Sequence, residues 1–381
     1  MTHQAKRELL KKIRPRYLKA SKAEKTRILD EFVAATDYNR KYAIHLLRNG
    51  PPRRSTKRAG RRRTYGPEVV AALAQVWEAS GRVCGKRLQP FIGEMAEVLE
   101  RHQELVISEQ TKTLLGQMST ATIDRRLQAA RARSAHRGRS VGGTKPGSLL
   151  KTAIPVRTFA DWDEAKPGFV EMDLVAHCGD TTTGVYLNTL CVVDIATGWT
   201  EPVAVANKGQ QATFEGIQIM RQRLPFPLLG IDSDNGSEFI NDHLHRYCLN
   251  QHITFTRSRP YRKNDQAHVE QKNWTAVRQW VGYHRYESPE ALALLEAIYA
   301  DLRLFINFFQ PVMKLIDKTR VGSKVRKQYD TAQTPYQRVL ASPDIDDSVK
   351  DQLRDLYLSL NPLALQRRIE ANLKKLWTLN R

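Results

Sequence analysis

Residues 230–241, GIDSDNGSEFIN, place two aspartates directly after an apolar run. The run PLLGI at 227–231 is typical of a buried strand, and the Asn-Gly pair at 235–236 is a turn signal. Asp232 and Asp234 therefore stand at the rim of a predicted sheet, where unpaired carboxylates repel one another. Because this arrangement costs free energy unless the carboxylates have a partner, the stretch indicates a functional site.

The charge of the chain is concentrated in its first part. The 381 residues have a formal net charge of +21 and an apolar content of 41%, enough for two or three domains with packed cores. Residues 1–150 contain 32 Lys and Arg against 13 Asp and Glu, whereas residues 151–381 contain 29 against 27. This asymmetry predicts a polyanion-binding N-terminal part, and we expect the polyanion to be double-stranded DNA. No basic amphipathic helix with an aromatic face points to a membrane surface.

The composition also excludes several classes of protein. No run of 18 apolar residues and no apolar signal-peptide core occurs, so we expect a soluble, cytoplasmic protein, nucleoid-associated if bacterial. The four cysteines include no CxxC pair, which argues against a disulfide framework and a cysteine-rich zinc module. His245, Cys248 and His252 share one face of a predicted helix, but they lack a fourth ligand. Packing against the sheet explains Cys248 better than zinc.

Residues 1–50 are predicted to form a first helix-turn-helix module. A helix is expected over residues 21–35 because its apolar residues share one face, and a break at Thr36-Asp37 supplies an N-cap for a second helix. The start of that second helix exposes donors suited to phosphates and base edges: Asn39, Arg40 and Lys41. An ordinary helical hairpin with a solvated basic face is the alternative.

A basic linker and a second module follow. Residues 51–66 have almost nothing to bury, and their arginines are candidates for contact with DNA phosphates or a narrow minor groove: Arg58, Arg61, Arg62 and Arg63. Residues 67–133 repeat the helix-turn-helix pattern. In its last helix Ile123 and Leu127 point inward, which leaves Arg125 and Arg126 for DNA. Residues 134–160 are rich in Gly and Ser and are a predicted interdomain linker.

Residues 161–310 change to strands and helices in the order β-β-β-α-β-α-β-α, which predicts a mixed α/β domain with a five-stranded sheet. Asp173 lies inside the first strand among apolar neighbours, an expensive place for a charge. Strands one and four are expected to be neighbours, and a helix across their ends could bring Glu270 to Asp173 and Asp234. Converging carboxylates repel, and divalent cations with oxygen ligands, above all Mg²⁺, are the usual remedy.

Other acids of this region are assigned less specific roles. Glu171 shares a strand face with Asp173, and a structural role is favoured over one in support of a site. Asp180 and Asp194 are expected in turns. Glu238 and Asp242 are expected early in a helix, where their charges favour the helix dipole.

Three motifs together resemble the catalytic core of DDE transposases and retroviral integrases. They are MD at 172–173, SDNGSEF at 233–239 and PYRKNDQAHVEQKN at 260–273, and the resemblance covers roughly residues 165–285. Thirty-five residues separate Asp234 from Glu270, as in that family. The chain lacks the zinc module of retroviral integrases, and it has Trp274 and Val277 where they carry basic residues.

The resemblance implies an RNase H-like fold in which Asp173, Asp234 and Glu270 are catalytic and hold two Mg²⁺ ions, with Mn²⁺ able to substitute. Asp232 is then a supporting residue. The resemblance also implies DNA-contacting residues around the site: Tyr261, Lys263, Gln266, Asn273 and Arg278.

The implied function is that of a bacterial insertion-sequence transposase. Such an enzyme cleaves the 3′ ends of its element and joins them to target DNA by in-line phosphoryl transfer. Its partners would be the element ends, target DNA and further copies of itself, at least as a dimer. A catalytically silent DNA-binding or regulatory protein is the main alternative, and a structure-selective nuclease is a second.

Residues 311–381 are predicted to be a basic segment followed by helices. The basic segment is expected to be extended, along DNA or against another subunit. The last helix has an apolar face that suits partner packing and intramolecular packing equally: Leu365, Ile369, Leu373 and Leu376.

Replacing Arg40 or Arg125 by alanine is expected to weaken DNA binding at moderate salt, because each removes a donor from a predicted recognition helix. Metal binding should be unchanged. The measurement is DNA affinity by fluorescence anisotropy, and an affinity equal to that of the wild type would mean that the recognition helices are misplaced.

Overall fold

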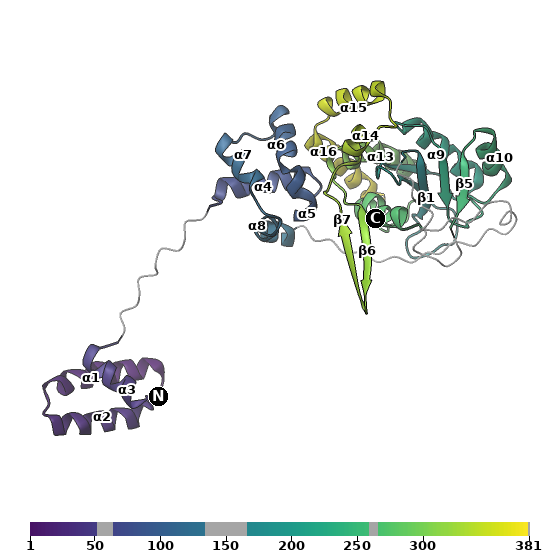
Figure 1. Ribbon diagram of the computed structural model, residues 1–381. Helices are drawn as coiled ribbons and strands as arrows, with labels where there is room; N and C mark the ends of the chain where they lie inside the picture. Colours follow the sequence, from purple (N-terminus) through teal and green to yellow (C-terminus); the bar gives the residue numbers. More distant parts are fainter. Residues whose placement is uncertain (52–63, 134–165, 259–265, 380–381) are drawn as a thin grey trace. The chain divides into compact units, whose positions relative to one another are not determined.

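The computed structural model describes residues 1–51, 64–133, 166–258 and 266–379 (Figure 1). The chain splits into two compact units, Met1–Thr64 and Tyr65–Arg381. Several predicted DNA contacts lie outside the described residues: Arg58, Arg61, Arg62, Arg63, Tyr261 and Lys263. Of the predicted linkers, residues 52–63 and 134–160 also lie outside them.

The first unit is a three-helix bundle of α1 (His3–Lys19), α2 (Lys22–Thr36) and α3 (Arg40–Asn49). The helices pack around buried apolar residues of all three, among them Leu10, Phe32 and Leu47. Sequence reasoning missed α1, although it placed α2 within one or two residues.

The turn between α2 and α3 corrects the predicted N-cap. Asp37 has a φ of 55° and ends α2, since aspartate tolerates the left-handed conformation better than most residues. The side chain of Asn39 then accepts a hydrogen bond from the backbone N–H of Lys41 and begins α3. Asn39 is therefore the N-cap, and the break at Thr36-Asp37 is a C-cap.

The second unit begins with a helical module, residues 67–133. It contains α4 (Pro67–Ala79), α5 (Gly85–Leu88), the short 3₁₀ turn η1 (Gln89–Phe91), α6 (Ile92–Arg101), α7 (Glu109–Gly116) and α8 (Thr120–Arg133). The Ser119 hydroxyl accepts from the backbone N–H of Thr122 at the start of α8. Ile123 and Leu127 of α8 are buried, as predicted.

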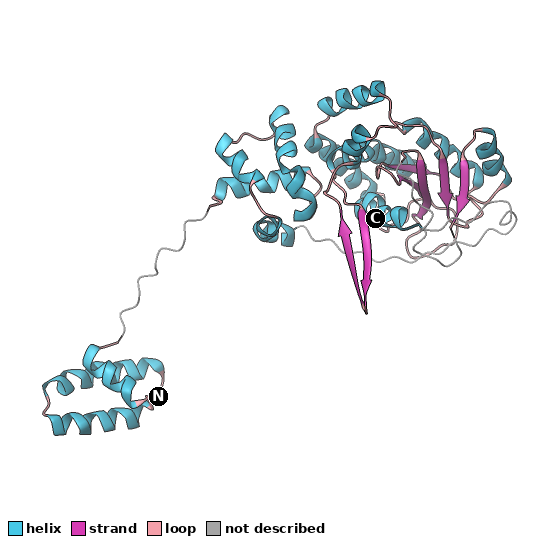
Figure 2. Ribbon diagram, in the orientation of Figure 1, coloured by secondary structure: helices cyan, strands magenta, loops and turns pink. Residues whose placement is uncertain are grey.

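A mixed five-stranded sheet follows, made of β1 (Phe169–Ala176), β2 (Asn188–Asp194), β3 (Thr200–Val205), β4 (Gly230–Ser233) and β5 (Thr254–Arg257). The strand order is β3-β2-β1-β4-β5, in which β1 pairs antiparallel with β2 and parallel with β4 (Figure 2). The helices α9 (Gln210–Arg223), α10 (Asp242–Asn250) and α11 (Ala267–Lys272) alternate with the later strands. This confirms the predicted order of elements and the adjacency of strands one and four.

The central strand β1 separates two different faces. Val170, Met172 and Leu174 belong to a core that contains residues of α9 and α10. Alternation along the strand places Glu171 and Asp173 on the opposite face, toward α11. Glu171 and Asp173 therefore face α11 rather than the core that contains residues of α9 and α10.

The chain continues with η4, a π-helical turn over Asn273–Arg278, and then α12 (Gln279–Val281) and the long α13 (Pro289–Phe309). A hairpin of β6 (Leu315–Val321) and β7 (Lys324–Tyr329) precedes α14 (Pro335–Ala341), α15 (Asp347–Ser359) and α16 (Pro362–Thr378). Sequence reasoning missed the hairpin. Among the described residues, no helix has both the length and the apolar character needed to cross a bilayer.

One hydrophobic cluster joins the helical module to the C-terminal helices. Its buried members run from Val69 to Leu127 in the module and include residues of α13, α14, α15 and α16. The apolar face of α16 is buried in this cluster, so intramolecular packing accounts for it. Polar contacts support the joint: Glu94 of α6 accepts hydrogen bonds from Gln337 and from the Tyr357 hydroxyl, at 2.5 and 2.7 Å.

A buried ion pair fixes α13 to the edge strand β3. The Arg303 guanidinium donates to both carboxylate oxygens of Glu201, at 2.6 and 2.8 Å, and Trp199 Nε1 donates to the same carboxylate. The Glu201 side chain is fully buried. Its three donors compensate for the loss of hydration.

Arg303→Ala is expected to lower the free energy of unfolding by about 3–5 kcal/mol, because it leaves a buried carboxylate without its counter-charge. The matched control is Arg354→Ala, which removes an exposed ion pair with Asp351 and should cost less than about 1 kcal/mol. Urea unfolding followed by circular dichroism measures both. Equal losses in the two variants would show that the Glu201 pair does not stabilise the fold.

Candidate active site

Asp173 and Asp234 meet at the end of the parallel pair β1–β4. Asp173 lies in the middle of β1, and Asp234 is the first residue after β4. Burial, with the nearby Asp234 carboxylate as the second cause, raises the pKa of Asp173 to about 7. Burial also raises the pKa of Asp234. The structure thus brings together two of the three predicted catalytic acids.

Asn273 contacts this pair from the start of η4. Its Nδ2 donates to Asp173 Oδ2 at 2.6 Å. Its Oδ1 is buried, and no donor among the described residues reaches it. A buried acceptor without a partner costs free energy, and here it lies beside two carboxylates. The predicted role of Asn273 in the active site stays a prediction, but its position fits that role.

Asp232 and Glu171 form a second pair with a different environment. The two residues are direct neighbours across β1 and β4. Asp232 is buried and accepts from the Thr256 hydroxyl at 2.6 Å and from Gln266 Nε2 at 3.5 Å. Glu171 Oε2 accepts from the backbone N–H of Val269 at 2.6 Å. Glu171 therefore binds the first turn of α11, and Asp232 binds the residue before it. Asp232 thus helps to attach this helix to the sheet.

Burial is the main cause that raises the pKa of Glu171 to about 8. The neighbouring Asp232 charge raises it further. Glu171 is therefore protonated at neutral pH, so the two buried acids do not carry two charges. This pair supports the fold around the site.

The loop after β4 contains a further acid that sequence reasoning placed wrongly. Asp234 Oδ1 accepts from the backbone N–H of Gly236 at 2.9 Å. A Cβ at Gly236 would lie 2.6 Å from the Glu238 carboxyl group, so a side chain there would displace that carboxyl group. Glu238 precedes α10, which begins at Asp242, and so it does not serve that helix as predicted.

Glu238 is instead a buried neighbour of the acid pair. Its pKa is raised by burial and by the Asp234 charge, and its own charge adds to the raised pKa of Asp173. Its position four residues after Asp234, in the same Asn-Gly loop, is the signal that could have identified it.

Glu270 lies on α11 between Gln266 and Asn273, which share its helix face. Its side chain is exposed, although its charge contributes to the raised pKa of Glu171. In the described parts of the chain, no group of three His, Cys, Asp or Glu residues has the geometry of a metal site. The π-helical turn that begins three residues after Glu270 is a feature often found at functional sites.

The residues of the Asp173–Asp234 pair fit a divalent cation in their donor chemistry. They offer two carboxylates and the unpartnered Asn273 oxygen, which are ligands that Mg²⁺ prefers. The raised pKa values of the carboxyl groups indicate that the protein alone supplies too little positive charge at this point.

Other predicted site residues have varied surroundings. Arg278 donates to the carbonyl oxygens of Ala176 and Gly282, at 2.5 and 3.3 Å, and is half-buried. Arg40, Lys41 and Arg125 are all exposed, and Arg40 forms an ion pair with Asp30 of α2. Arg126 is partly exposed on α8.

Cys248 is buried in the core with residues of α9 and α10, which confirms the predicted packing. Asp194 is the last residue of β2 rather than a turn residue. Its carboxylate accepts from the backbone N–H groups of Gly168 and of Thr197 in the following turn, both at 2.8 Å.

A protein of Sinorhizobium fredii (strain NBRC 101917 / NGR234), named "Uncharacterized protein y4rM", is 44% identical to this chain over 335 residues. The match covers 87% of this chain and 94% of that protein. The chain belongs to the y4rM family. No family model matches this member of the y4rM family.

Solved structures similar to part of this y4rM-family chain are retroviral integrase catalytic cores. The catalytic core domain of BIV integrase is 18% identical with a TM-score of 0.28, over 45% of this chain and 91% of that one. The HTLV-2 integrase catalytic core domain in complex with magnesium, in its dimeric form, is 15% identical with a TM-score of 0.29. That match covers 38% of this chain and 90% of that one. At TM-scores this low, the similarity assigns no role to individual residues of this chain.

Asp173→Asn is expected to stabilise the protein at neutral and alkaline pH in the presence of a chelator. The pKa of Asp173 is about 7 in the folded state against an ordinary 3.8, so the folded protein retains a proton that the unfolded chain has lost. The free energy of unfolding therefore falls as pH rises through this window, and the full cost applies above it.

The gain in the Asp173→Asn variant should exceed about 1 kcal/mol at neutral pH and above and should vanish near the ordinary pKa of aspartate. Urea unfolding over a pH series measures it, with the exposed Asp242→Asn as control. A wild-type pH dependence in Asp173→Asn would contradict the assigned pKa.

Proposed function

We propose that this chain is a DNA transposase that cleaves the 3′ ends of a mobile element and transfers them to target DNA. The observation that carries the proposal is the pair of Asp173, in the middle of β1, and Asp234, just after the neighbouring parallel strand β4, with the unpartnered oxygen of Asn273 on the residue that binds Asp173. These residues come from the three motifs that resemble the DDE family. The proposal assigns catalysis to Asp173, Asp234 and Glu270.

Two Mg²⁺ ions, which Mn²⁺ could replace, would stabilise the attacking and leaving oxygens of the phosphoryl transfer when held by these three acids. Asn273 orients the Asp173 carboxylate through its hydrogen bond of 2.6 Å. Asp232 and Glu171 hold Gln266 and the first turn of α11, and thereby position Glu270 at the edge of the site. Because the Glu270 side chain is exposed, the proposal requires it to turn toward Asp173 when metal and DNA bind.

The proposed reaction needs two attacks on phosphodiester bonds and no covalent intermediate with the protein. Water attacks first and releases a 3′-OH at the element end. That 3′-OH then attacks a target phosphodiester, so that one bond forms as another breaks. Two element ends must be held together, and the proposal therefore includes self-association on DNA.

DNA recognition is assigned to the basic helices of the N-terminal part. Exposed Lys41 at the start of α3 and exposed Arg125 on α8 are available to phosphates and base edges. Arg40, Arg126 and the cap residue Asn39 lie beside them in sequence. The helix-turn-helix assignment remains part of the proposal.

One observation favours a second function, that of a catalytically silent DNA-binding protein. Glu270 is exposed, and the described residues contain no three-acid metal group. A regulatory protein could keep the acid pair for folding alone. The following experiment distinguishes the two functions.

Asp234→Asn is expected to lower nicking and strand transfer by about 100-fold or more, the scale of losing one strong electrostatic contribution to catalysis. The substrate is DNA that carries the flanking ends of the element, with Mg²⁺ or Mn²⁺, and products are resolved on denaturing gels. The matched control is Asp242→Asn, an exposed acid just beyond the same loop, which should retain activity.

Glu270→Gln should abolish cleavage and leave DNA affinity unchanged. Wild-type activity in Asp234→Asn or Glu270→Gln would refute the assigned acids. Tight binding without cleavage by the wild-type protein would establish the regulatory function instead.

A further inference from the structure

Among the described residues, nothing buries the strands of the β6–β7 hairpin. All residues of β6 and β7 are exposed, and the hairpin projects from the second unit (Figures 1 and 2). Gly322 at its tip has a φ of +62°, the sign that a type II′ turn requires at its first central position. The sequence VGSK at 321–324 therefore encodes a tight two-residue turn.

The hairpin would be an unfavourable structure if its only role were to stabilise the fold. A two-stranded hairpin is marginally stable by itself in water. Lys318 lies directly opposite Lys327, and like charges in that position destabilise a strand pair. Ile316 and Val321 are 63% and 69% exposed, so the strands bury little apolar surface. These costs indicate that the hairpin acts on something outside the chain.

The root of the hairpin is rigid, in contrast to its strands. Asp330 accepts from the backbone N–H of Lys314 at 2.6 Å and pairs with Arg338 of α14 at 2.7 Å. Lys314 Nζ donates to the carbonyl oxygen of Ala196 at 2.7 Å, and Val312 and Gln333 form an isolated bridge. The hairpin thus leaves the body in a fixed direction.

The charge of the hairpin is strongly positive on both faces. The two strands contain one acidic residue, Asp317, and five basic residues: Lys318, Arg320, Lys324, Arg326 and Lys327. The strand register places three of them on one face and Lys324 with Arg326 on the other. In the part of the chain that the structure describes, none of the five takes part in an ion pair.

We propose that the β6–β7 hairpin is a DNA-binding arm that enters the major groove of double-stranded DNA. A two-stranded ribbon fits a groove about 12 Å wide, and strands of six and seven residues reach roughly 20–23 Å. Charges on both faces suit a groove, because phosphates line both of its sides, whereas a flat anionic surface would call for one charged face. The inference rests on the proposed function, since it takes DNA as the substrate.

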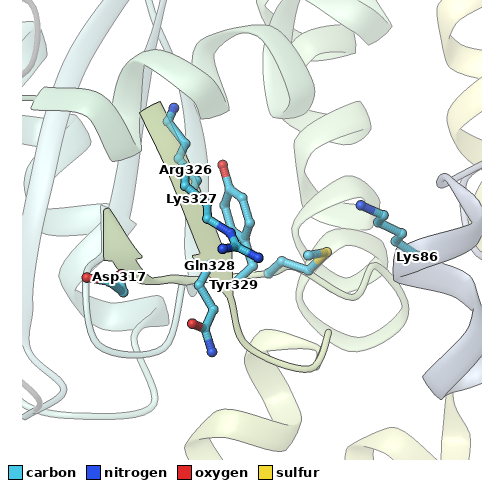
Figure 3. A pocket seen from close by; sticks show the side chains of 7 residues that line it. Lys86, Asp317, Arg326, Lys327, Gln328 and Tyr329 are labelled. Carbon is cyan, nitrogen blue, oxygen red and sulfur yellow. The ribbon is translucent and has the colours of Figure 1, made fainter. Parts of the chain in front are cut away.

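A pocket at the root links the hairpin to the helical module. It has a volume of about 390 Å³ and is lined by residues of β6, β7 and their surroundings, together with Lys86: Lys86, Met313, Asp317, Arg326, Lys327, Gln328 and Tyr329 (Figure 3). Lys86 belongs to α5, and the neighbouring Gly85 N–H donates to Asp124 of α8 at 2.9 Å. Lys86 therefore adds a positive charge beside the hairpin, from a helix that is hydrogen-bonded to α8.

The test is DNA affinity of the full-length protein for a duplex of arbitrary sequence, measured over a series of salt concentrations. Lys318→Gln/Lys327→Gln is expected to weaken binding about tenfold at moderate salt and to reduce the slope of log affinity against log salt by nearly 2, about 0.9 for each lost phosphate contact. The variant also removes a repulsion, so its Tm should not fall. Arg320→Gln/Arg326→Gln should reproduce the effect with one charge from each face.

The matched control is Lys374→Gln/Lys375→Gln, which removes two exposed charges of α16 and should leave the salt slope unchanged. If the hairpin variants bind with the wild-type affinity and slope, the arm is refuted while the proposed function stands. If the wild-type protein does not bind DNA, the DNA-binding arm and the proposed function are both refuted. If instead the variants change the sedimentation of the DNA-free protein and keep the wild-type salt slope, the hairpin is a contact between protein copies, and the inference is overturned.

Discussion

The burial of acids on one face of the sheet is the constraint on which the site depends. Glu171 and Asp232 are buried and Asp173 is partly buried near the helix that starts at Ala267, and carboxyl groups removed from water are stable only when donors reach them. The donors come from that helix and its ends: Gln266, the Val269 N–H and Asn273. Because these positions recur at roughly one-turn intervals, the acids fix both the height and the rotation of the helix on the sheet. The position of Glu270 follows from this attachment.

The two acid pairs solve the same electrostatic problem in different ways. Glu171 and Asp232 accept hydrogen bonds from the Val269 N–H and the Thr256 hydroxyl, although Glu171 Oε1 has no partner among the described residues. Asp173 accepts from Asn273 Nδ2 and Asp234 accepts from the Gly236 N–H, whereas the Asn273 oxygen has no donor among the described residues. A fold that only needed stability would have replaced these groups by apolar residues. The two pairs therefore differ in their donors, and each has one buried oxygen beside it without a partner among the described residues.

The sequence predicts the sheet well because strand alternation and turn signals are local, and the adjacency of Asp173 and Asp234 follows from the topology of the mixed sheet. It predicts long-range features less well. The burial of α16 against the helical module depends on contacts across more than 250 residues, and the role of Glu238 depends on how one loop closes over Asp234. The direction of the Glu270 side chain and the π-helical turn after it also depend on packing, which no local pattern encodes.

The shared core of the helical module and the C-terminal helices has a consequence for synthesis of the chain. Residues 1–64 form their own compact unit and can fold as soon as they leave the ribosome. The module that follows has its apolar surface completed by residues as late as Leu376, five positions from the end of the chain. The first unit is thus ready early in translation, whereas the helical module of the second is completed only when α16 has been released. A product that ended before α16 would retain the first unit with an incomplete second one.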